Sequence, residues 1–211
     1  MSFLKMGVAD KIMHRVRARG RGKWVCTPTD FLDLGTRASV DQALSRLVKG
    51  DDLRRVGHGF YDWPRVSRMT KRPVPVDLDR VVSALARRDG IRIMPDGMAS
   101  ANRLGLTNAV PGKASYVTDG ASRTLRVGGR TIHLRHAGAK VMSWAGRSAA
   151  PVVQALRWFG PEAACDDWVI KTLSRKLPDD VKRDLARHWG SLPGWAVPIV
   201  KNLTASQETA Q

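Results

Sequence analysis

The strongest constraint on the fold lies in residues 27–63, where helix-starting and helix-stopping residues follow one another at short spacing. Thr27 before Pro28 places a capping side chain ahead of a proline at the first helical position, which predicts a short helix ending at a glycine turn. Thr36 then caps a second helix, and Gly50 ends it as a left-handed residue. The segment therefore predicts two short helices joined by a tight turn.

A hairpin is predicted directly after the second helix. Two β-prone runs, residues 53–56 and 60–63, flank the turn Gly57-His58-Gly59. A short helix, a tight turn, a second helix and a basic hairpin together are typical of a winged helix-turn-helix. In that fold the second helix lies in the major groove of double-stranded DNA, so we expect such DNA as a partner.

The predicted second helix has two chemically different faces. Its apolar stripe consists of Val40, Ala43, Leu44 and Leu47. Gln42 and Arg46 lie one turn apart on the opposite face. These two residue types pair bidentately with adenine and guanine, respectively, so this face is suited to reading base edges.

Candidate DNA-contacting residues lie on this helix and on the hairpin. They are Arg37, Ser39, Gln42, Arg46, Lys49, Arg54, Arg55 and His58. Arg37 and Ser39 lie at the positively polarised helix start, where phosphate contacts are expected. The hairpin residues suit a wing that contacts the DNA backbone or minor groove. The alternative interpretation is that these polar side chains are merely solvated.

Net charge also favours a polyanionic partner. The 211 residues carry 36 Lys and Arg against 19 Asp and Glu, a formal net charge of +17, and residues 1–72 hold 16 of the basic and 7 of the acidic side chains. Such a charge favours nucleic acid first and an anionic membrane surface second. One basic run is either a phosphate-binding face or a solvated helix end, and it comprises Lys11, Arg15, Arg17, Arg19, Arg21 and Lys23.

Membrane and secretory classes are not favoured. No apolar run approaches the roughly 20 residues that span a bilayer. Residues 1–19 are basic throughout, unlike a secretory signal with its apolar centre. The two cysteines, Cys26 and Cys165, are far apart and fit a reducing compartment. We therefore expect a cytoplasmic protein with no membrane partner.

A basic segment with two prolines divides the chain. The prolines of residues 65–76 fix the backbone and keep their predecessors out of helix, so this segment is predicted to be an extended linker. We expect a winged-helix domain over residues 1–64, a second domain over 77–203 and a frayed polar tail over 204–211. The predicted fold class is α+β.

The second domain is predicted to be a mixed α/β domain that ends in helices. Its clearest signal is a hairpin over residues 123–135 with the two-residue turn Gly128-Gly129. This turn places Thr124 opposite His133, so that one hairpin face is polar and the other apolar. The other predicted elements are helices over residues 78–88, 96–104, 151–159, 166–176, 178–189 and 195–203, and strands over 91–94 and 114–118.

No catalytic or metal-binding pattern stands out. Glutamate occurs only at Glu162 and Glu208, so paired-carboxylate chemistry would rest on aspartates such as Asp77-Leu78-Asp79, which better fits a helix start. His133 and His136 would point to opposite faces of one strand and so would not chelate one ion. We expect no enzyme, no catalytic residues, no metal site and no cofactor.

Tryptophan is concentrated in the second half of the chain, with five of seven residues from Trp144 onward. Four of them lie in predicted helices beside other apolar residues: Trp158, Trp168, Trp189 and Trp195. Large aromatic side chains in this setting predict core positions rather than base-stacking platforms.

Several segments resemble one known family. Thr36–Val48 and Leu53–Pro64 are similar to the N-terminal winged helix of the AbiEi-type antitoxins of type IV toxin–antitoxin and abortive-infection systems. Ala101–Pro111, with Gly105-Leu106-Thr107 and the Gly128-Gly129 hairpin after it, resembles the opening of that family's C-terminal antitoxin domain. The resemblance covers roughly residues 25–135.

The resemblance implies two activities. The N-terminal domain would repress its own operon by binding inverted repeats in the operator, and the C-terminal domain would counteract a nucleotidyltransferase-like toxin encoded beside it. Carried over by position, Arg37, Gln42 and Arg46 become operator-reading candidates. Two alternatives stay open: a transcriptional regulator of similar build with no toxin partner, and an RNA-binding protein.

Overall fold

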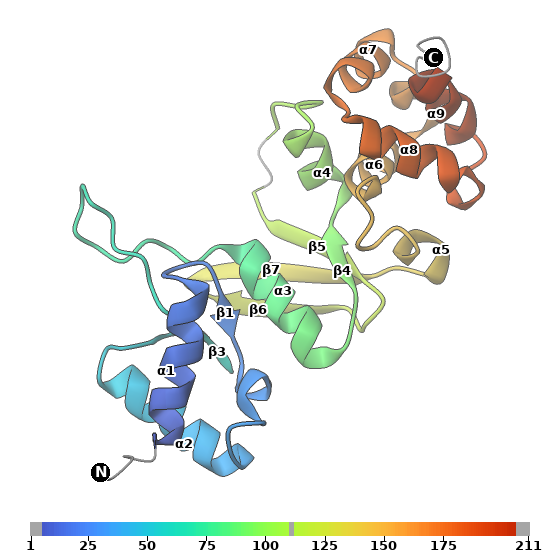
Figure 1. Ribbon diagram of the computed structural model, residues 1–211. Helices are drawn as coiled ribbons and strands as arrows, with labels where there is room; N and C mark the ends of the chain where they lie inside the picture. Colours follow the sequence, from blue (N-terminus) through green and yellow to red (C-terminus); the bar gives the residue numbers. More distant parts are fainter. Residues whose placement is uncertain (1–5, 110–111, 206–211) are drawn as a thin grey trace. The chain divides into compact units, whose positions relative to one another are not determined.

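Figure 1 shows the computed structural model, which describes residues 6–109 and 112–205. The fold is α+β, with two small sheets and helices around them. The chain separates into two compact units. Unit 1 comprises the described residues up to Ile91 together with Leu125–Thr131, and unit 2 comprises Arg92–Thr124 and the described residues from Ile132 onward.

Unit 1 begins with alternating helices and short strands. Its elements are, in order, α1 (Val8–Arg19), β1 (Val25–Cys26), the 3-10 helix η1 (Pro28–Phe31), α2 (Arg37–Lys49), β2 (Arg54–Gly57), β3 (Phe60–Asp62) and α3 (Leu78–Asp89). The three strands form an antiparallel sheet in the order β1-β3-β2. The core below α1 and α2 is built from buried side chains that include Ile12, Val16, Phe31 and Leu44.

Local signals set the boundaries of the first helices. The carboxylate of Asp30 accepts hydrogen bonds from the Thr27 backbone N–H and hydroxyl, at 2.8 and 3.0 Å, which caps η1 as expected. The Thr36 hydroxyl caps α2 by accepting from the Ser39 N–H. The expected stop at Gly50 is only partly right, because its φ is −88° and the left-handed residue is Asp51, with a φ of 58°.

Helix α3 belongs to unit 1, whereas the sequence placed Leu78–Asp89 in the second domain. The helix buries Val81 and Leu85 within the molecule. Its Arg87 donates a hydrogen bond to the backbone carbonyl of Val25 and lies 3.3 Å from the Asp30 carboxylate. These contacts join residues about 60 positions apart, so no local pattern reveals them.

The segment 65–76 was expected to be extended, but the chain turns back within it. Val66 and Pro73 form an isolated antiparallel bridge, and Lys71 takes a left-handed conformation with a φ of 56°. The Arg72 carbonyl accepts a hydrogen bond from the Ser67 N–H at 2.9 Å. The prolines exclude a helix here but do not exclude a turn, and the segment forms a loop that folds back on itself (Figure 1, teal).

Unit 2 combines a sheet with a group of helices. Its strands are β4 (Ile93–Pro95), β5 (Ala114–Thr118), β6 (Arg123–Val127) and β7 (Arg130–His136), in the order β4-β5-β7-β6. Strands β5 and β7 are parallel, and β4 pairs antiparallel with β5. The helices are α4 (Gly97–Arg103), α5 (Ala139–Met142), α6 (Ala150–Ala164), α7 (Asp167–Lys176), α8 (Asp179–Arg187), the 3-10 helix η2 (Trp189–Ser191) and α9 (Ala196–Ala205).

The predicted hairpin turn is confirmed. Gly128 and Gly129 both have positive φ, at 54° and 76°, which a two-residue turn between twisted strands requires. The Thr124 hydroxyl lies 3.2 Å from His133 Nδ1, as expected for opposite residues. The tip of this hairpin groups with unit 1, where the Gly128 N–H donates to the Val56 carbonyl at 2.7 Å.

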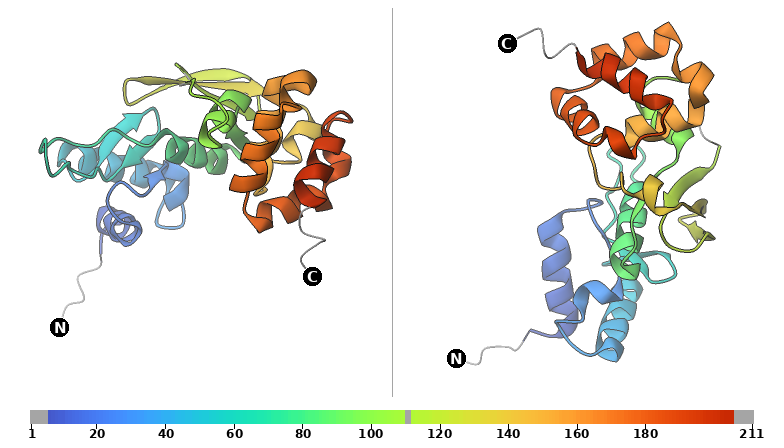
Figure 2. Two further views of the ribbon diagram at one scale, coloured as in Figure 1. Left: turned by 90° about the horizontal axis from the view of Figure 1, so that it is seen from above. Right: turned by 90° about the vertical axis from the view of Figure 1, so that its right-hand side faces the viewer.

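Helices α6–α9 gather into one group (Figure 2, orange to red) around buried residues such as Leu156, Leu173 and Val200. Helix α4 packs closely on α6, since a Cβ at Gly97 would lie 2.7 Å from the Gln154 carbonyl oxygen. Helix α6 is kinked at Gly160, whose φ is 76°. No described helix is long and apolar enough to cross a membrane.

The prediction that the helical tryptophans belong to the core is wrong for three of them. Trp158, Trp168 and Trp189 expose 41%, 53% and 54% of their surface, whereas Trp144 is fully buried. Apolar neighbours along a helix do not decide burial, because each side chain is buried only if another element covers its face. The exposed indoles are therefore surface features of unit 2.

Candidate nucleic-acid interface

Helix α2 has the two faces that its sequence predicts. Its apolar stripe is buried in the unit 1 core: Val40, Ala43, Leu44 and Leu47. The opposite side exposes Gln42, Arg46 and Lys49. Arg37 is exposed at the start of the helix, and Ser39 is half-buried. Gln42, Arg46 and Lys49 therefore share one accessible face.

The polar side chains of α2 differ in whether they have partners. Within the described part of the chain, Gln42, Arg46 and Lys49 make no side-chain hydrogen bond or ion pair. Arg37 Nε lies 2.9 Å from the Asp41 carboxylate, and both side chains are exposed. The Ser39 hydroxyl donates to the Thr36 carbonyl at 2.8 Å. The three residues without partners are thus the ones free to contact a ligand.

The β2–β3 hairpin is less open than its sequence suggests. Arg55 and His58 are exposed, with Arg55 Nη2 3.5 Å from His58 Nδ1. Its turn, however, is covered inside unit 1, since the Arg88 guanidinium lies 4.7 Å from the Phe60 ring centroid and the Arg126 carbonyl oxygen lies close to Gly57. The side chains of Arg55 and His58 are therefore exposed, whereas the turn residues Gly57 and Gly59 are half-buried.

Arg54 is held within the protein. Its guanidinium forms two hydrogen bonds with the carboxylate of Asp62, at 2.9 and 2.6 Å, and a third with the Val74 carbonyl at 3.0 Å. Asp62 is only 3% exposed, so this ion pair neutralises a buried charge. Three N–H groups of Arg54 are therefore engaged within unit 1, so Arg54 has fewer donors to offer a ligand than the exposed Arg55.

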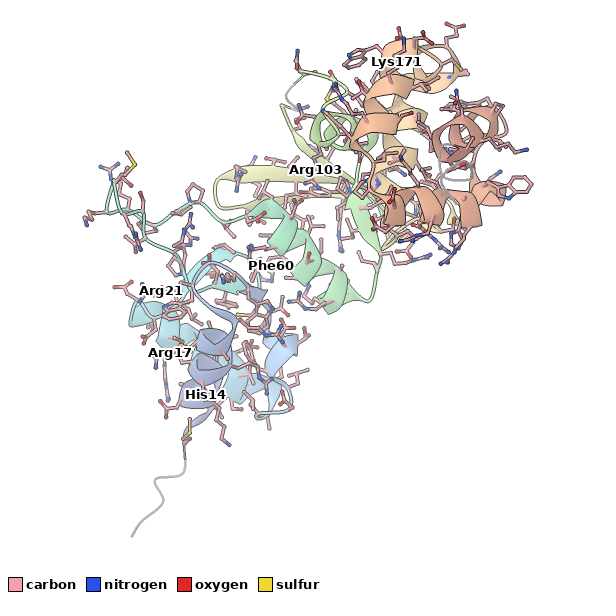
Figure 3. The ribbon with its side chains drawn as sticks, turned by 45° about the horizontal axis from the view of Figure 1, so that its top comes forward. His14, Arg17, Arg21, Phe60, Arg103 and Lys171 are labelled. Atoms are coloured by element: carbon pink, nitrogen blue, oxygen red, sulfur yellow. The ribbon has the colours of Figure 1, made fainter. Side chains whose placement is uncertain are left out.

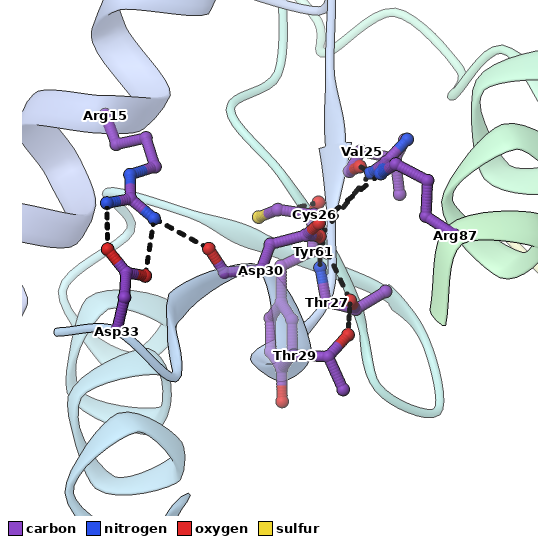
Figure 4. Close-up of polar contacts among 9 residues, drawn as sticks. All are labelled: Arg15, Val25, Cys26, Thr27, Thr29, Asp30, Asp33, Tyr61 and Arg87. Atoms are coloured by element: carbon purple, nitrogen blue, oxygen red, sulfur yellow. Dashed lines mark hydrogen bonds and ion pairs between the residues drawn. The ribbon is translucent and has the colours of Figure 1, made fainter. Parts of the chain in front are cut away.

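A polar network fixes the turn that precedes α2 (Figure 4). Arg15 of α1 forms two hydrogen bonds with the Asp33 carboxylate and donates a third to the Asp30 carbonyl. The hydrogen bond from Arg15 lowers the pKa of Asp33. These contacts of Arg15 hold α1 against the turn before α2 and so position α2.

The buried Cys26 lies close to this network. Burial raises the pKa of its thiol, so this cysteine stays protonated and unreactive.

Further cations of unit 1 meet at a pocket of about 280 Å³. Arg21, Lys23 and Arg65 are exposed along it, beside the Arg54–Asp62 and Arg80–Asp77 ion pairs. Figure 3 labels Arg21 together with Arg17 of α1. The sequence places Arg21 and Lys23 in the N-terminal basic run and Arg65 in the basic linker, but Arg80 was not among the candidate residues. These residues come together only through the tertiary fold.

The described residues contain no group of three or more His, Cys, Asp or Glu side chains that would hold a metal ion. His133 faces Thr124, whereas His136 Nδ1 lies 3.0 Å from the Gly120 carbonyl oxygen. The two histidines therefore make separate polar contacts within unit 2.

Comparison with known proteins gave one match. No curated protein and no solved structure matches the chain. A model described as a family of unknown function, DUF6088, matches residues 11–185. This span contains α2, the β2–β3 hairpin, both sheets and the chain as far as α8. The protein therefore belongs to the DUF6088 family.

Proposed function

We propose that this protein is a winged helix-turn-helix regulator that binds double-stranded DNA, and that it acts by binding rather than by catalysis. The observation that carries the proposal is the exposed face of α2, where Gln42, Arg46 and Lys49 project from a helix whose other face is buried. A DNA-reading helix needs this combination, because base edges are recognised by side chains whose hydrogen-bonding groups are available.

The arrangement of unit 1 supports the same proposal. Elements α1, β1, η1, α2, β2 and β3 occur in the order of a winged helix-turn-helix, with sheet order β1-β3-β2. Helix α2 has 13 residues and is therefore about 20 Å long, and the major groove, roughly 12 Å wide, admits a helix of this kind. In this interpretation α2 enters the groove, and Arg55 and His58 act from the wing.

Phosphate contacts are assigned to other exposed cations of unit 1. Lys49 and Arg37 lie at opposite ends of α2, and Arg21, Lys23 and Arg65 line the basic pocket of the same unit. Such contacts orient a protein on the duplex without reading sequence. Arg54 is left out of the interface because Asp62 and Val74 occupy its guanidinium.

A mobility-shift titration with the DNA upstream of the protein's own gene tests the proposal. Arg46→Ala and Gln42→Ala are each expected to weaken binding to the cognate site by about 1 to 3 kcal/mol. Each variant should also reduce the difference in affinity between the cognate and a scrambled duplex. Arg17→Ala is the matched control, since it removes an exposed helix charge from α1 instead. If Arg46→Ala and Arg17→Ala preferred the cognate over the scrambled duplex by the same factor, α2 would not read DNA.

We further propose a physiological role from the resemblance to AbiEi-type antitoxins. Unit 1 would repress the protein's own operon at inverted repeats in the cytoplasm, and the part of the chain after residue 76 would counteract a nucleotidyltransferase-like toxin. The resemblance in Ala101–Pro111 and the Gly128-Gly129 hairpin supports this role. Without a toxin gene beside it, the same DNA-binding unit fits a transcriptional regulator with no toxin partner.

Growth rescue separates the two activities. The full chain carrying Arg37→Ala, Gln42→Ala and Arg46→Ala is expected to lose repression but still to protect cells that express the adjacent toxin. The full chain is required, because unit 1 includes Leu125–Thr131 and the two units interleave in sequence. If the folded triple variant failed to protect while the wild type protected, protection would work through DNA binding and the two-activity proposal would fail.

A further inference from the structure

Helix α8 borders a second basic pocket, entirely within unit 2. The pocket has a volume of about 440 Å³ and is lined by Arg147, Ser148, Asp180, Arg183, Asp184 and Arg187. Arg183 and Arg187 are exposed one turn apart on α8. Across the described residues neither of them has a hydrogen bond or ion pair, so both guanidinium groups are available to a ligand.

The acidic residue deepest in this cluster is already neutralised. Asp184 accepts hydrogen bonds from the Ala149 N–H at 3.0 Å and the Ser148 hydroxyl at 3.3 Å. Its carboxylate also lies 3.5 Å from Arg147 and 3.0 Å from His188. Burial favours a raised pKa for Asp184, but these hydrogen bonds and charges outweigh it and the pKa is lowered. Asp180, the other acidic residue that lines the pocket, is exposed.

An exposed indole lies directly after α8. Trp189 is 54% exposed although it follows Arg187 by only two residues. Lys201 Nζ lies over one side of this ring, 5.8 Å from its centroid, in a cation–π contact. Proteins hold an unpaired base and its flanking phosphates with exposed aromatic rings and free cations, and α8 and the residues directly after it supply both kinds of group.

We infer that the α8–Trp189 surface binds single-stranded nucleic acid. Arg183 and Arg187 contact phosphates, and an unpaired base stacks on Trp189. A duplex is a poorer ligand, because its bases are already stacked on one another. This site is separate from the duplex-binding face assigned to α2, and the inference does not depend on that assignment.

Fluorescence polarisation with a labelled 12-nucleotide uridine RNA tests the inference on the full chain. Trp189→Ala is expected to weaken binding about tenfold, because one base stack is lost. Trp189→Phe, which keeps an aromatic face, is expected to restore most of the affinity. The double variant Arg183→Ala, Arg187→Ala is expected to weaken binding and to reduce its salt dependence.

Trp168→Ala is the matched control. Trp168 is as exposed as Trp189, at 53%, but it follows Asp166 and Asp167 and so lies in an acidic setting. We expect no more than a twofold change in RNA affinity for this variant. Thermal unfolding of each variant checks that the fold is retained.

Several outcomes decide the inference. Tighter binding of the RNA than of the same-sequence DNA would identify RNA as the ligand through its 2′-hydroxyls, and equal binding would identify single strands of either kind. A loss of less than twofold for Trp189→Ala would overturn the inference, as would equal losses for Trp189→Ala and Trp168→Ala. It would also fail if Trp189→Ala weakened duplex binding equally, or if the double variant Arg183→Ala, Arg187→Ala left RNA binding unchanged.

Discussion

Helices α2 and α8 both expose polar side chains one turn apart, but their surroundings differ. On α2, Gln42 and Arg46 stand on the open face of a helix with no exposed indole beside them. On α8, Arg183 and Arg187 line a pocket and precede the exposed Trp189. The first arrangement fits a groove with regular base edges, whereas the second fits a chain whose bases are free to stack.

The comparison also teaches that an arginine must be judged by its partners. Arg54 and Arg55 are adjacent in β2, yet Arg54 is paired with the buried Asp62 and Arg55 is exposed. In unit 2, Arg147 contacts Asp184 and His188, whereas Arg183 and Arg187 have no ion-pair partner among residues 6–109 and 112–205. Net charge alone therefore overstates how many cations are available to a ligand.

Salt dependence should give the largest contrast between the two surfaces. About six phosphate contacts on duplex DNA predict a slope of log K against log salt near −5, a loss of about a thousandfold between roughly 50 and 200 mM salt. The two arginines Arg183 and Arg187 on a single strand predict a slope of about −1.4, a loss of about sevenfold over the same range. Polarisation titrations at several salt concentrations measure both slopes, and equal slopes would remove the distinction.

Arg54→Ala is expected to lower the free energy of unfolding by about 3 kcal/mol, because the buried Asp62 carboxylate would lose its partner. Urea denaturation measures the change. Arg55→Ala, one residue along, is the control and is expected to change unfolding by less than about 0.5 kcal/mol. If both variants were equally stable, Arg54 would return to the set of possible DNA contacts.

Asp184→Asn is expected to cost about 2 kcal/mol of stability at neutral pH, since the carboxylate accepts two hydrogen bonds and faces Arg147 and His188. Folding lowers the Asp184 pKa. The stabilisation is therefore complete above the unfolded-state pKa of about 3.9 and is lost as pH falls through the lower folded-state value. Urea titrations measure how much larger the free energy of unfolding is for the wild type than for Asp184→Asn. This difference should be constant from about pH 7 to 5 and should shrink below about pH 4. If the difference in free energy of unfolding grew as the pH fell, the ionised Asp184 carboxylate would not be the stabilising form.

Arg37→Ala should have the smallest effect on stability. Its ion pair with Asp41 joins two exposed side chains and is expected to contribute less than about 0.5 kcal/mol. If Arg37→Ala lowered the free energy of duplex binding by more than it lowered the free energy of unfolding, the excess would indicate a contact between Arg37 and DNA. Thermal unfolding beside the mobility shift measures both quantities, and a destabilisation above about 1 kcal/mol would refute the surface-pair interpretation.

Periodicity and turn chemistry predicted the parts that depend on near neighbours. The buried stripe of α2 follows from its 3.6-residue period, and the β6–β7 turn follows from two glycines that tolerate positive φ. The indoles of Trp168 and Trp189 were not predictable in this way. Their exposure depends on which faces the other helices of unit 2 cover.

The sequence by itself determined where helices and hairpins begin and end, because caps, glycines and prolines act within a few residues. Only the tertiary structure decided which charged groups remain free. Arg87 reaches Asp30 across 57 positions, and Arg147 reaches His188 across 41. It also brought α3 into unit 1 and looped out residues 65–76. The physical reason is that an ion pair or a covered face requires a partner from a distant element, and local pattern carries no information about that partner.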